Sequence, residues 1–227
     1  MLPWELLDTA RIPGSDEALR LKRRGREYSI MLGTNELMNS RLSGSEQALA
    51  TLAFEKIRDR QQKRILIGGL GMGFTLRAAL AALDGTAKVT VAELVPAVVA
   101  WAKGPMADLH AGSLTDPRVD IVEGDVGALI RSSRAGYDAI LLDVDNGPEG
   151  LSRQSNDSLY DHRGIGESYQ ALSPGGVLSV WSSGPDPQFT RRLQRAGFTT
   201  EEKPVRANGK SGARHMIWLG VKADRAS

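Results

Sequence analysis

Short apolar runs alternate with segments of helical spacing along most of the chain, and this alternation predicts strands and helices in turn. Strands are predicted at residues 65–67, 88–92, 119–122, 137–142, 177–181, 199–205 and 215–221. Apolar positions recur at helical intervals at residues 48–57, 76–83, 166–172 and 185–196. Strand and helix alternation predicts an α/β fold, in which helices cover both faces of a twisted sheet and the chain ends in an antiparallel hairpin.

The N-terminal part has a different pattern. Residues 17–23 and 27–32 flank a turn at Arg24-Gly25 and are typical of a β-hairpin too small to have its own core. Residues 1–16 contain Pro and Gly and are predicted to run over the surface. Residues 33–41 form a polar loop, which either covers a ligand or merely connects the hairpin to the next helix. We therefore divide the chain into residues 1–44, a hairpin module with a lid loop, and residues 45–227, a nucleoside-binding domain.

The strand at residues 65–67 ends in a glycine-rich turn before the next helix. Glycines stand at positions 68, 69, 71 and 73. Without a Cβ the turn can reach positive φ and bring bare backbone against a ligand, with the first N–H groups of the helix facing it. This spacing alone also fits an ordinary tight turn, so its meaning depends on the strands that follow.

Carboxylates stand at the ends of those strands. Glu93 follows the strand at residues 88–92, where an acid is placed to accept hydrogen bonds from the two hydroxyls of a ribose. Asp125 follows the next strand, and Asp143 and Asp145 follow the one after. Ligands bind outside the carboxyl ends of parallel strands, so this edge predicts a nucleoside site. A helix N-cap is the alternative role for Asp125.

Composition narrows the chemistry. The chain has 227 residues, no cysteine and a net charge of +2, and its three histidines show no ligand spacing, so we expect no metal. No apolar run approaches the roughly 20 residues that span a bilayer, and the N-terminus lacks the pattern of a signal peptide, so we expect a cytoplasmic protein without membrane contact. Basic groups lack interleaved aromatics, which argues against nucleic acid as a partner. The tryptophans are interpreted as packing residues.

Taken jointly, the motifs resemble those of the class I methyltransferase fold, which is Rossmann-like, and within it the spermidine synthase (polyamine aminopropyltransferase) branch. The shared pieces are Gly-x-Gly-x-Gly followed by Thr75-Leu76-Arg77, Ala92-Glu93-Leu94-Val95-Pro96, Asp116-Pro117-Arg118-Val119 ahead of Gly124-Asp125, and Leu172-Ser173-Pro174-Gly175-Gly176-Val177-Leu178. The resemblance implies a decarboxylated S-adenosylmethionine donor, aminopropyl transfer to a polyamine, and a homodimer formed through the N-terminal module.

The motifs also assign candidate residues. Glu93 would hold the ribose, Asp125 the adenine amino group, and the glycine turn the donor's tail. The full set of candidate cofactor-binding residues is Gly69, Gly71, Met72, Gly73, Glu93, Leu94, Asp125, Val126 and Asp143. Glu46 and Asp145 would contact the substrate, and the candidate catalytic residues are Asp143, Asp145 and Asn146.

Several acids of that family are replaced here. Met72 stands where the family has an aspartate in the glycine turn, and Gly44-Ser45-Glu46 replaces Tyr-His-Glu. A gapless match to the family's Asp-Ser-Ser-Asp puts Asn146 at the last acid, which acts as general base, whereas a one-residue gap puts Asp145 there. Burying ammonium groups without paired carboxylates costs several kcal/mol. The replacements therefore favour a donor that keeps its own carboxylate, S-adenosylmethionine itself.

Two hypotheses follow. The first is a spermidine synthase-like transferase that moves an alkyl group, aminopropyl or methyl, from the sulfonium of S-adenosylmethionine or its decarboxylated form to a small amine, mainly by positioning the reactants. Family likeness favours aminopropyl transfer and the missing acids favour methyl transfer. The second hypothesis is a nucleoside-binding protein without turnover. The identity of the acceptor is not encoded in any motif of the loops at residues 33–44 and 147–164.

Overall fold

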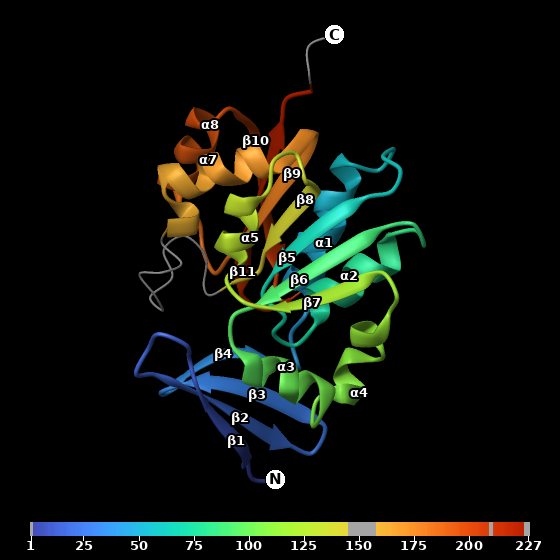
Figure 1. The fold of residues 1–227 in the computed structure, drawn as a ribbon. Coiled ribbons are helices and arrows are strands. Elements are labelled where there is room, and N and C mark those ends of the chain that lie inside the picture. The colour runs from blue at the N-terminus through green and yellow to red at the C-terminus, as the bar shows by residue number, and fades with distance from the viewer. Residues whose placement is uncertain (1, 145–157, 209–210, 225–227) are drawn as a thin grey trace.

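Two β-sheets form the framework of the computed structural model, which describes residues 2–144, 158–208 and 211–224 (Figure 1). The larger sheet has the strand order β10-β11-β9-β8-β5-β6-β7. Its strands are β5 (Arg64–Gly68), β6 (Lys88–Glu93), β7 (Val119–Glu123), β8 (Tyr137–Leu142), β9 (Leu172–Ser182), β10 (Phe198–Arg206) and β11 (Arg214–Lys222). Strands β5 to β9 pair in parallel, and β10 and β11 form the expected antiparallel hairpin, which pairs with β9.

Helices cover both faces of this sheet, as predicted (Figure 1). Helices α1 (Gly44–Lys56) and α2 (Phe74–Ala82) lie on one face, and α5 (Val126–Ser132), α7 (His162–Ala171) and α8 (Pro187–Arg195) lie on the other. The connection from β6 to β7 contains α3 (Pro96–Lys103), α4 (Ala107–His110) and the 3-10 turn η1 (Ser113–Thr115). No helix in the described ranges is both long and apolar enough to span a bilayer.

The short apolar runs of the sequence supply both cores. Along β5, Ile65 and Ile67 contribute to the cluster under α1 and α2, whereas Leu66 contributes to the cluster under α5, α7 and α8. Successive side chains of a strand point to opposite faces, so a strand covered on both faces needs apolar residues at every position. This requirement explains why these strands read as continuous apolar runs.

The N-terminal module is a four-stranded antiparallel sheet in the order β1-β2-β3-β4. Strands β2 (Ala18–Arg24) and β3 (Glu27–Leu32) confirm the predicted hairpin. The loop predicted at residues 33–41 was wrong, because β4 (Asn35–Asn39) lies within it. Residues 1–16 contain β1 (Glu5–Arg11), a largely exposed strand that the sequence did not indicate. Pairing with the hairpin edges supplies the backbone hydrogen bonds, and these are tertiary partners that a local pattern does not reveal.

The module packs against the larger domain, as expected from its size. Leu21 and Ile30 are fully buried and belong to the same apolar cluster as α1, α2 and α3. The Trp101 indole N–H of α3 donates to Asp8 Oδ2 at 2.6 Å, and the Tyr28 hydroxyl donates to the Pro105 carbonyl at 2.5 Å. These bonds fix the inner face of the module above the carboxyl end of the larger sheet.

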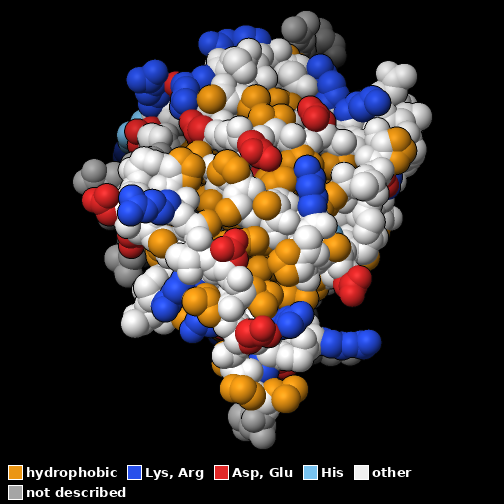
Figure 2. Space-filling view, turned by 60° about the horizontal axis from the view of Figure 1, so that its bottom comes forward, with side chains coloured by type: hydrophobic (Ala, Val, Ile, Leu, Met, Phe, Trp, Pro, Cys, Tyr) orange, Lys and Arg blue, Asp and Glu red, His pale blue; other side chains and the backbone are white. Residues whose placement is uncertain are grey.

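The outer side of the module presents apolar surface. Figure 2 brings this end of the molecule towards the viewer and shows apolar side chains gathered between scattered charges. Leu2 and Leu6 are large apolar side chains of this module that are exposed. The predicted homodimer and the division of the chain at residue 44 stay predictions.

Candidate functional site

The glycine turn between β5 and α2 has the backbone conformation that the sequence predicted. Gly69 and Gly73 have φ values of +91° and +76°, a region that favours glycine. A Cβ at Gly69 would overlap the carbonyl oxygen of Asp143, and one at Gly73 would overlap the His110 ring. The turn therefore passes close to the end of β8, at the point where the strand order reverses between β5 and β8.

Glu93 holds this turn in place. Its Oε2 accepts a hydrogen bond from the Leu70 N–H, and its Oε1 accepts one from the Val95 N–H, both at 2.9 Å. The side chain is buried, so these charge-assisted bonds lie in a poorly hydrated setting, where they are strong. One carboxylate thus joins the turn after β5 to the turn after β6.

A first cavity opens at this edge. Predicted cofactor residues in its lining are Gly69, Gly71, Glu93, Leu94, Asp125, Val126 and Asp143. Apolar side chains of the N-terminal module complete the lining, namely Ile12, Leu19, Leu32, Leu37 and Met38. An apolar wall opposite a few convergent polar groups is the usual composition of a small-molecule pocket.

Asp125 has the capping role that the sequence allowed, and it also lines the first cavity. It is the N-cap of α5, because its Oδ1 accepts a hydrogen bond from the Gly127 N–H at 2.8 Å. Its Oδ2 accepts one from the Arg131 guanidinium at 3.0 Å. The same residue lines the first cavity. Capping fixes the position of its carboxylate at the cavity wall.

A second cavity adjoins the first, and the two share Leu37, Met38, Gly71 and Asp143 in their linings. Its volume is about 280 Å³, which is near the lower end of the roughly 300–1,000 Å³ of small-molecule pockets. Met72, Gly73 and Glu46 line it, together with Ser45, Trp181 and His215. The size and the carboxylates suit a small, positively charged molecule.

Glu46 and Asp143 form an acidic pair in this second cavity. The Thr75 hydroxyl donates to Asp143 Oδ2 at 2.6 Å. Burial, with the neighbouring Glu46 charge as a smaller contribution, raises the pKa of Asp143 to about 7. Burial also raises the pKa of Glu46, against the opposing effect of its hydrogen bond from Ser45. Both carboxyl groups are removed from water by burial and repel each other when ionised, so a bound cation would lower their free energy.

A chain of polar contacts runs from Glu46 to the C-terminal hairpin. The Ser45 hydroxyl donates to Glu46 Oε2 at 2.7 Å, and His215 Nδ1 lies 2.9 Å from Ser45 Oγ. The His215 ring also meets Trp181 edge to face at a centroid distance of 4.8 Å. Burial lowers the pKa of His215.

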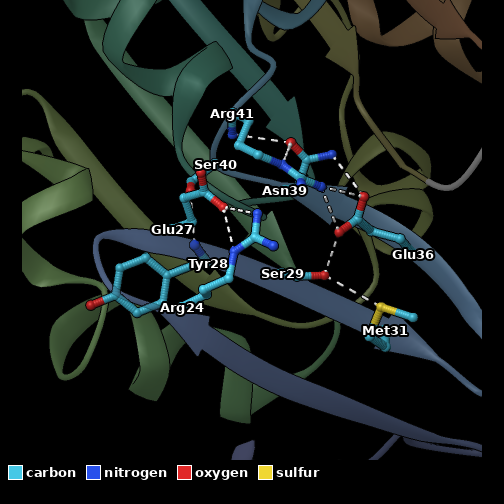
Figure 3. Close-up of polar contacts among 9 residues, drawn as sticks. All are labelled: Arg24, Glu27, Tyr28, Ser29, Met31, Glu36, Asn39, Ser40 and Arg41. Atoms are coloured by element: carbon cyan, nitrogen blue, oxygen red, sulfur yellow. Dashed lines mark hydrogen bonds and ion pairs between the residues drawn. The ribbon is translucent and has the colours of Figure 1, made fainter. Parts of the chain in front are cut away.

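Strand β4 covers both cavities and is held by the polar network of Figure 3. Glu36 accepts hydrogen bonds from the Ser29 hydroxyl at 2.6 Å, from the Asn39 amide at 3.1 Å and from the Arg41 guanidinium at 3.0 Å. The network fixes both ends of the strand, and between them Leu37 and Met38 face the shared part of the cavities. Residues that the sequence treated as a lid loop therefore form an anchored strand.

Two of the predicted catalytic residues, Asp145 and Asn146, lie outside the described residues. Among the residues that the structure describes, no cluster of His, Asp and Glu has the arrangement of a metal site. Trp101 and Trp218 are buried, in line with their interpretation as packing residues, whereas Trp181 lines the second cavity. The sequence did offer a reason to place Trp181 in the site, because it ends a predicted strand at the same sheet edge as the acids. No pattern in the sequence indicated that Ser45 and His215 would meet there.

The two sheets, with the paired cavities at the strand ends, define a Rossmann-like fold of the class I methyltransferase type. Residues 46–193 match the spermine/spermidine synthase domain, which is more than half of the chain. The chain therefore belongs to the spermine/spermidine synthase family, as its motifs suggested.

Curated relatives and a solved structure agree with this assignment. The chain is 32% identical over 147 residues to polyamine aminopropyltransferase 1 of Streptomyces coelicolor, covering 61% of this chain and 27% of that protein. It is 34% identical over 125 residues to putrescine N-methyltransferase 4 of Nicotiana tabacum, covering 52% and 31%. The matches thus span about a quarter to a third of these relatives. The spermidine synthase of Thermotoga maritima superimposes with a TM-score of 0.75 at 19% identity, over 96% of this chain and 74% of that one, which shows a shared fold.

Proposed function

We propose that this chain transfers an alkyl group from an S-adenosyl sulfonium nucleoside in the first cavity to a small amine, a polyamine or diamine, in the second. The observation that carries the proposal is the meeting of two unlike cavities at Asp143 and Gly71. The first cavity is mainly apolar and contains Glu93 and Asp125 at the strand ends, whereas the second contains the acidic pair Glu46 and Asp143. The relatives named for aminopropyl transfer and for putrescine N-methylation support an amine as acceptor.

The residues of the first cavity fit such a donor. Gly69 and Gly71 line this cavity and carry no Cβ, so a ligand can lie against their backbone. In the proposed complex Glu93 holds the ribose hydroxyls, Asp125 the adenine amino group, and Gly69 to Gly73 the tail. When bound, the sulfonium makes the attached carbon electrophilic and leaves as a neutral thioether.

The residues of the second cavity fit the acceptor. Glu46 and Asp143 bind the ammonium group and direct its nitrogen towards the shared part of the cavities. Trp181 offers an aromatic surface of the kind that contacts cations and alkyl chains. Because transfer from sulfonium needs little covalent assistance, this placement supplies most of the catalysis.

Aminopropyl transfer is the leading form of this function, and methyl transfer is the second candidate. Family membership supports the first. Met72 supports the second, because this buried thioether stands in the turn at the position where the resembling family has an acid for the donor's amino group. A donor that keeps its carboxylate does not need that acid.

Product analysis tests the proposal. The protein is incubated with either donor form and with short diamines, and the thioether is identified by mass spectrometry. Methylthioadenosine formed from the decarboxylated donor indicates aminopropyl transfer, and S-adenosylhomocysteine formed from S-adenosylmethionine indicates methyl transfer. Binding without either product supports a nucleoside-binding protein that lacks turnover, and contradicts the proposed transferase.

Calorimetry tests the donor site separately. Glu93→Gln should weaken binding of both donor forms at least tenfold, because loss of a charge-assisted hydrogen bond corresponds to about 1.5–3 kcal/mol. Glu123→Ala is the matched control, since Glu123 pairs with Glu93 across β6 and β7 but is exposed and does not line the cavity. Equal affinities for the Glu93 variant and the control would refute the donor site.

A further inference from the structure

Ser45 links two titratable groups that come from distant parts of the chain. It is the second residue of α1, is almost fully buried, and contacts Glu46 on the same helix and His215 on β11. A serine hydroxyl carries one hydrogen and can accept others, so it can pass a proton between two neighbours. The distances of 2.7 Å and 2.9 Å are both within hydrogen-bond range.

Glu46 and His215 lie at opposite ends of this link. Glu46 faces Asp143 in the second cavity, where the proposed acceptor binds. His215 is half-buried and follows the exposed Arg214 at the beginning of β11. The link therefore leads from the interior of the cavity towards its rim.

We propose that Glu46, Ser45 and His215 form a proton path that removes the proton which the acceptor ammonium must lose before its nitrogen can attack. This inference rests on the proposed function and deepens it. Glu46 contacts the acceptor, whereas Ser45 and His215 act through Glu46 and are positioning residues.

One proton moves along this path for each alkyl group that is transferred. Before transfer the Ser45 hydroxyl donates its one hydrogen to the ionised Glu46 carboxylate. Once the ammonium has given a proton to Glu46, the Ser45 hydroxyl rotates towards His215 Nδ1, the unprotonated nitrogen of the neutral ring. The Glu46 proton then passes to Ser45 Oγ as the Ser45 hydroxyl proton passes to His215 Nδ1. The neutral amine nitrogen then forms the new C–N bond with its lone pair as the C–S bond breaks, and the electron pair stays on sulfur. His215 releases its extra proton to solvent. One proton is released for each alkyl group transferred.

The surroundings of His215 suit a group that must be neutral to accept a proton. In the described part of the chain, the charged side chains that line this cavity with His215 are Glu36, Glu46 and Asp143, from β4, α1 and the end of β8. Val205 faces it across β10, and Trp181 and Ser183 come from the end of β9. Burial lowers its pKa, so the imidazole is neutral at physiological pH.

Steady-state kinetics with a short diamine and the donor that the wild-type enzyme uses tests the path. His215→Asn keeps a side-chain oxygen that can accept a hydrogen bond from Ser45 but cannot take up a proton, and Ser45→Ala breaks the link. Each should lower kcat roughly 10²-fold near pH 7, the lower end of general-base effects, with the KM for the donor unchanged. The double variant should lose no more than either single variant, since both lie on one path.

The pH profile separates this role from a structural one. The deficit of both variants should shrink towards pH 10, because the diamine then arrives with a neutral nitrogen. His162→Asn, at an exposed histidine, and Ser43→Ala, at the N-cap position of α1 outside the cavity, should behave as wild type. Additive losses that do not change with pH would overturn the proposal.

A measurement without turnover separates failure of the path from failure of the proposed function. The His215 imidazole is titrated by NMR in the wild-type, Ser45→Ala and Glu46→Gln proteins. The path predicts that both substitutions move the His215 titration, whereas His162 stays unchanged. Shifts in an inactive protein would contradict the transferase alone, and turnover without kinetic or NMR effects would contradict the path alone.

Discussion

The buried pair of Glu46 and Asp143 should make the folded protein less stable as the pH rises, and Asp143→Asn tests this expectation. Burial and the Glu46 charge raise the pKa of Asp143 from 3.8 to about 7. A carboxyl with a raised pKa in the folded state stabilises the fold below its unfolded pKa, and this contribution is lost as the pH rises through the folded pKa. Above pH 7 the ionised Asp143 therefore destabilises the protein. Asparagine keeps the shape and an oxygen that can accept the Thr75 hydroxyl, but it carries no charge.

The magnitude follows from the shift. A pKa raised from 3.8 to about 7 corresponds to roughly 4 kcal/mol in total. Of this, roughly 2–3 kcal/mol appears between pH 8 and pH 5, because the folded carboxyl is protonated at the lower pH while the unfolded one is still ionised. Asp143→Asn lacks this gain. Its stability relative to wild type should therefore be highest at pH 8 and fall by that amount at pH 5.

Urea unfolding of both proteins from pH 5 to pH 9 measures the difference, and equal m values confirm that the two unfolding reactions are comparable. Glu46→Gln should shift the balance in the same direction, and the two substitutions should be less than additive because they relieve one repulsion. A stability difference that is constant over this range, or one that favours wild type more at pH 8 than at pH 5, would refute the buried-pair reasoning.

Three further changes test other parts of the site and fold. Gly73→Ala should lower stability by about 1–3 kcal/mol, since alanine is strained at positive φ and its Cβ would overlap the His110 ring; a thermal double-mutant cycle with His110→Ala should recover part of the loss. Glu36→Ala should leave the free energy of unfolding within about 1 kcal/mol of the wild-type value, because the ion pair of Glu36 with Arg41 is partly exposed. It should nevertheless accelerate hydrogen exchange in β4 and weaken donor binding. Unchanged exchange in β4 would contradict the anchoring role of Glu36. Asp138→Asn should cost about 3 kcal/mol at pH 7 by breaking its pair with Arg60. Burial raises the pKa of Asp138, but hydrogen bonds from the Arg64 backbone N–H, Ser173 and Arg60 outweigh burial and lower this pKa, so the cost should diminish in urea unfolding as the pH falls below 4.

The sequence alone determined the parallel sheet and its functional edge. Residues 65–67 and 139–142 are apolar at every position because both faces of their strands are covered, and this pattern is local enough to read. The glycines at 69 and 73 and the acid at 93 follow strands that must end at one edge. Their proximity was therefore fixed once the strands were assigned.

Tertiary structure decided the remainder. Strands β1 and β4 form by pairing with a hairpin, so polar and glycine-containing segments became regular structure without a local signal. Ser45 and His215 are 170 positions apart and meet because β11 packs beside β9 under α1. Likewise, the raised pKa of Asp143 depends on burial and on Glu46, which belongs to another element. Periodicity records which face a residue occupies, whereas long-range partners and desolvation arise only when the elements pack together.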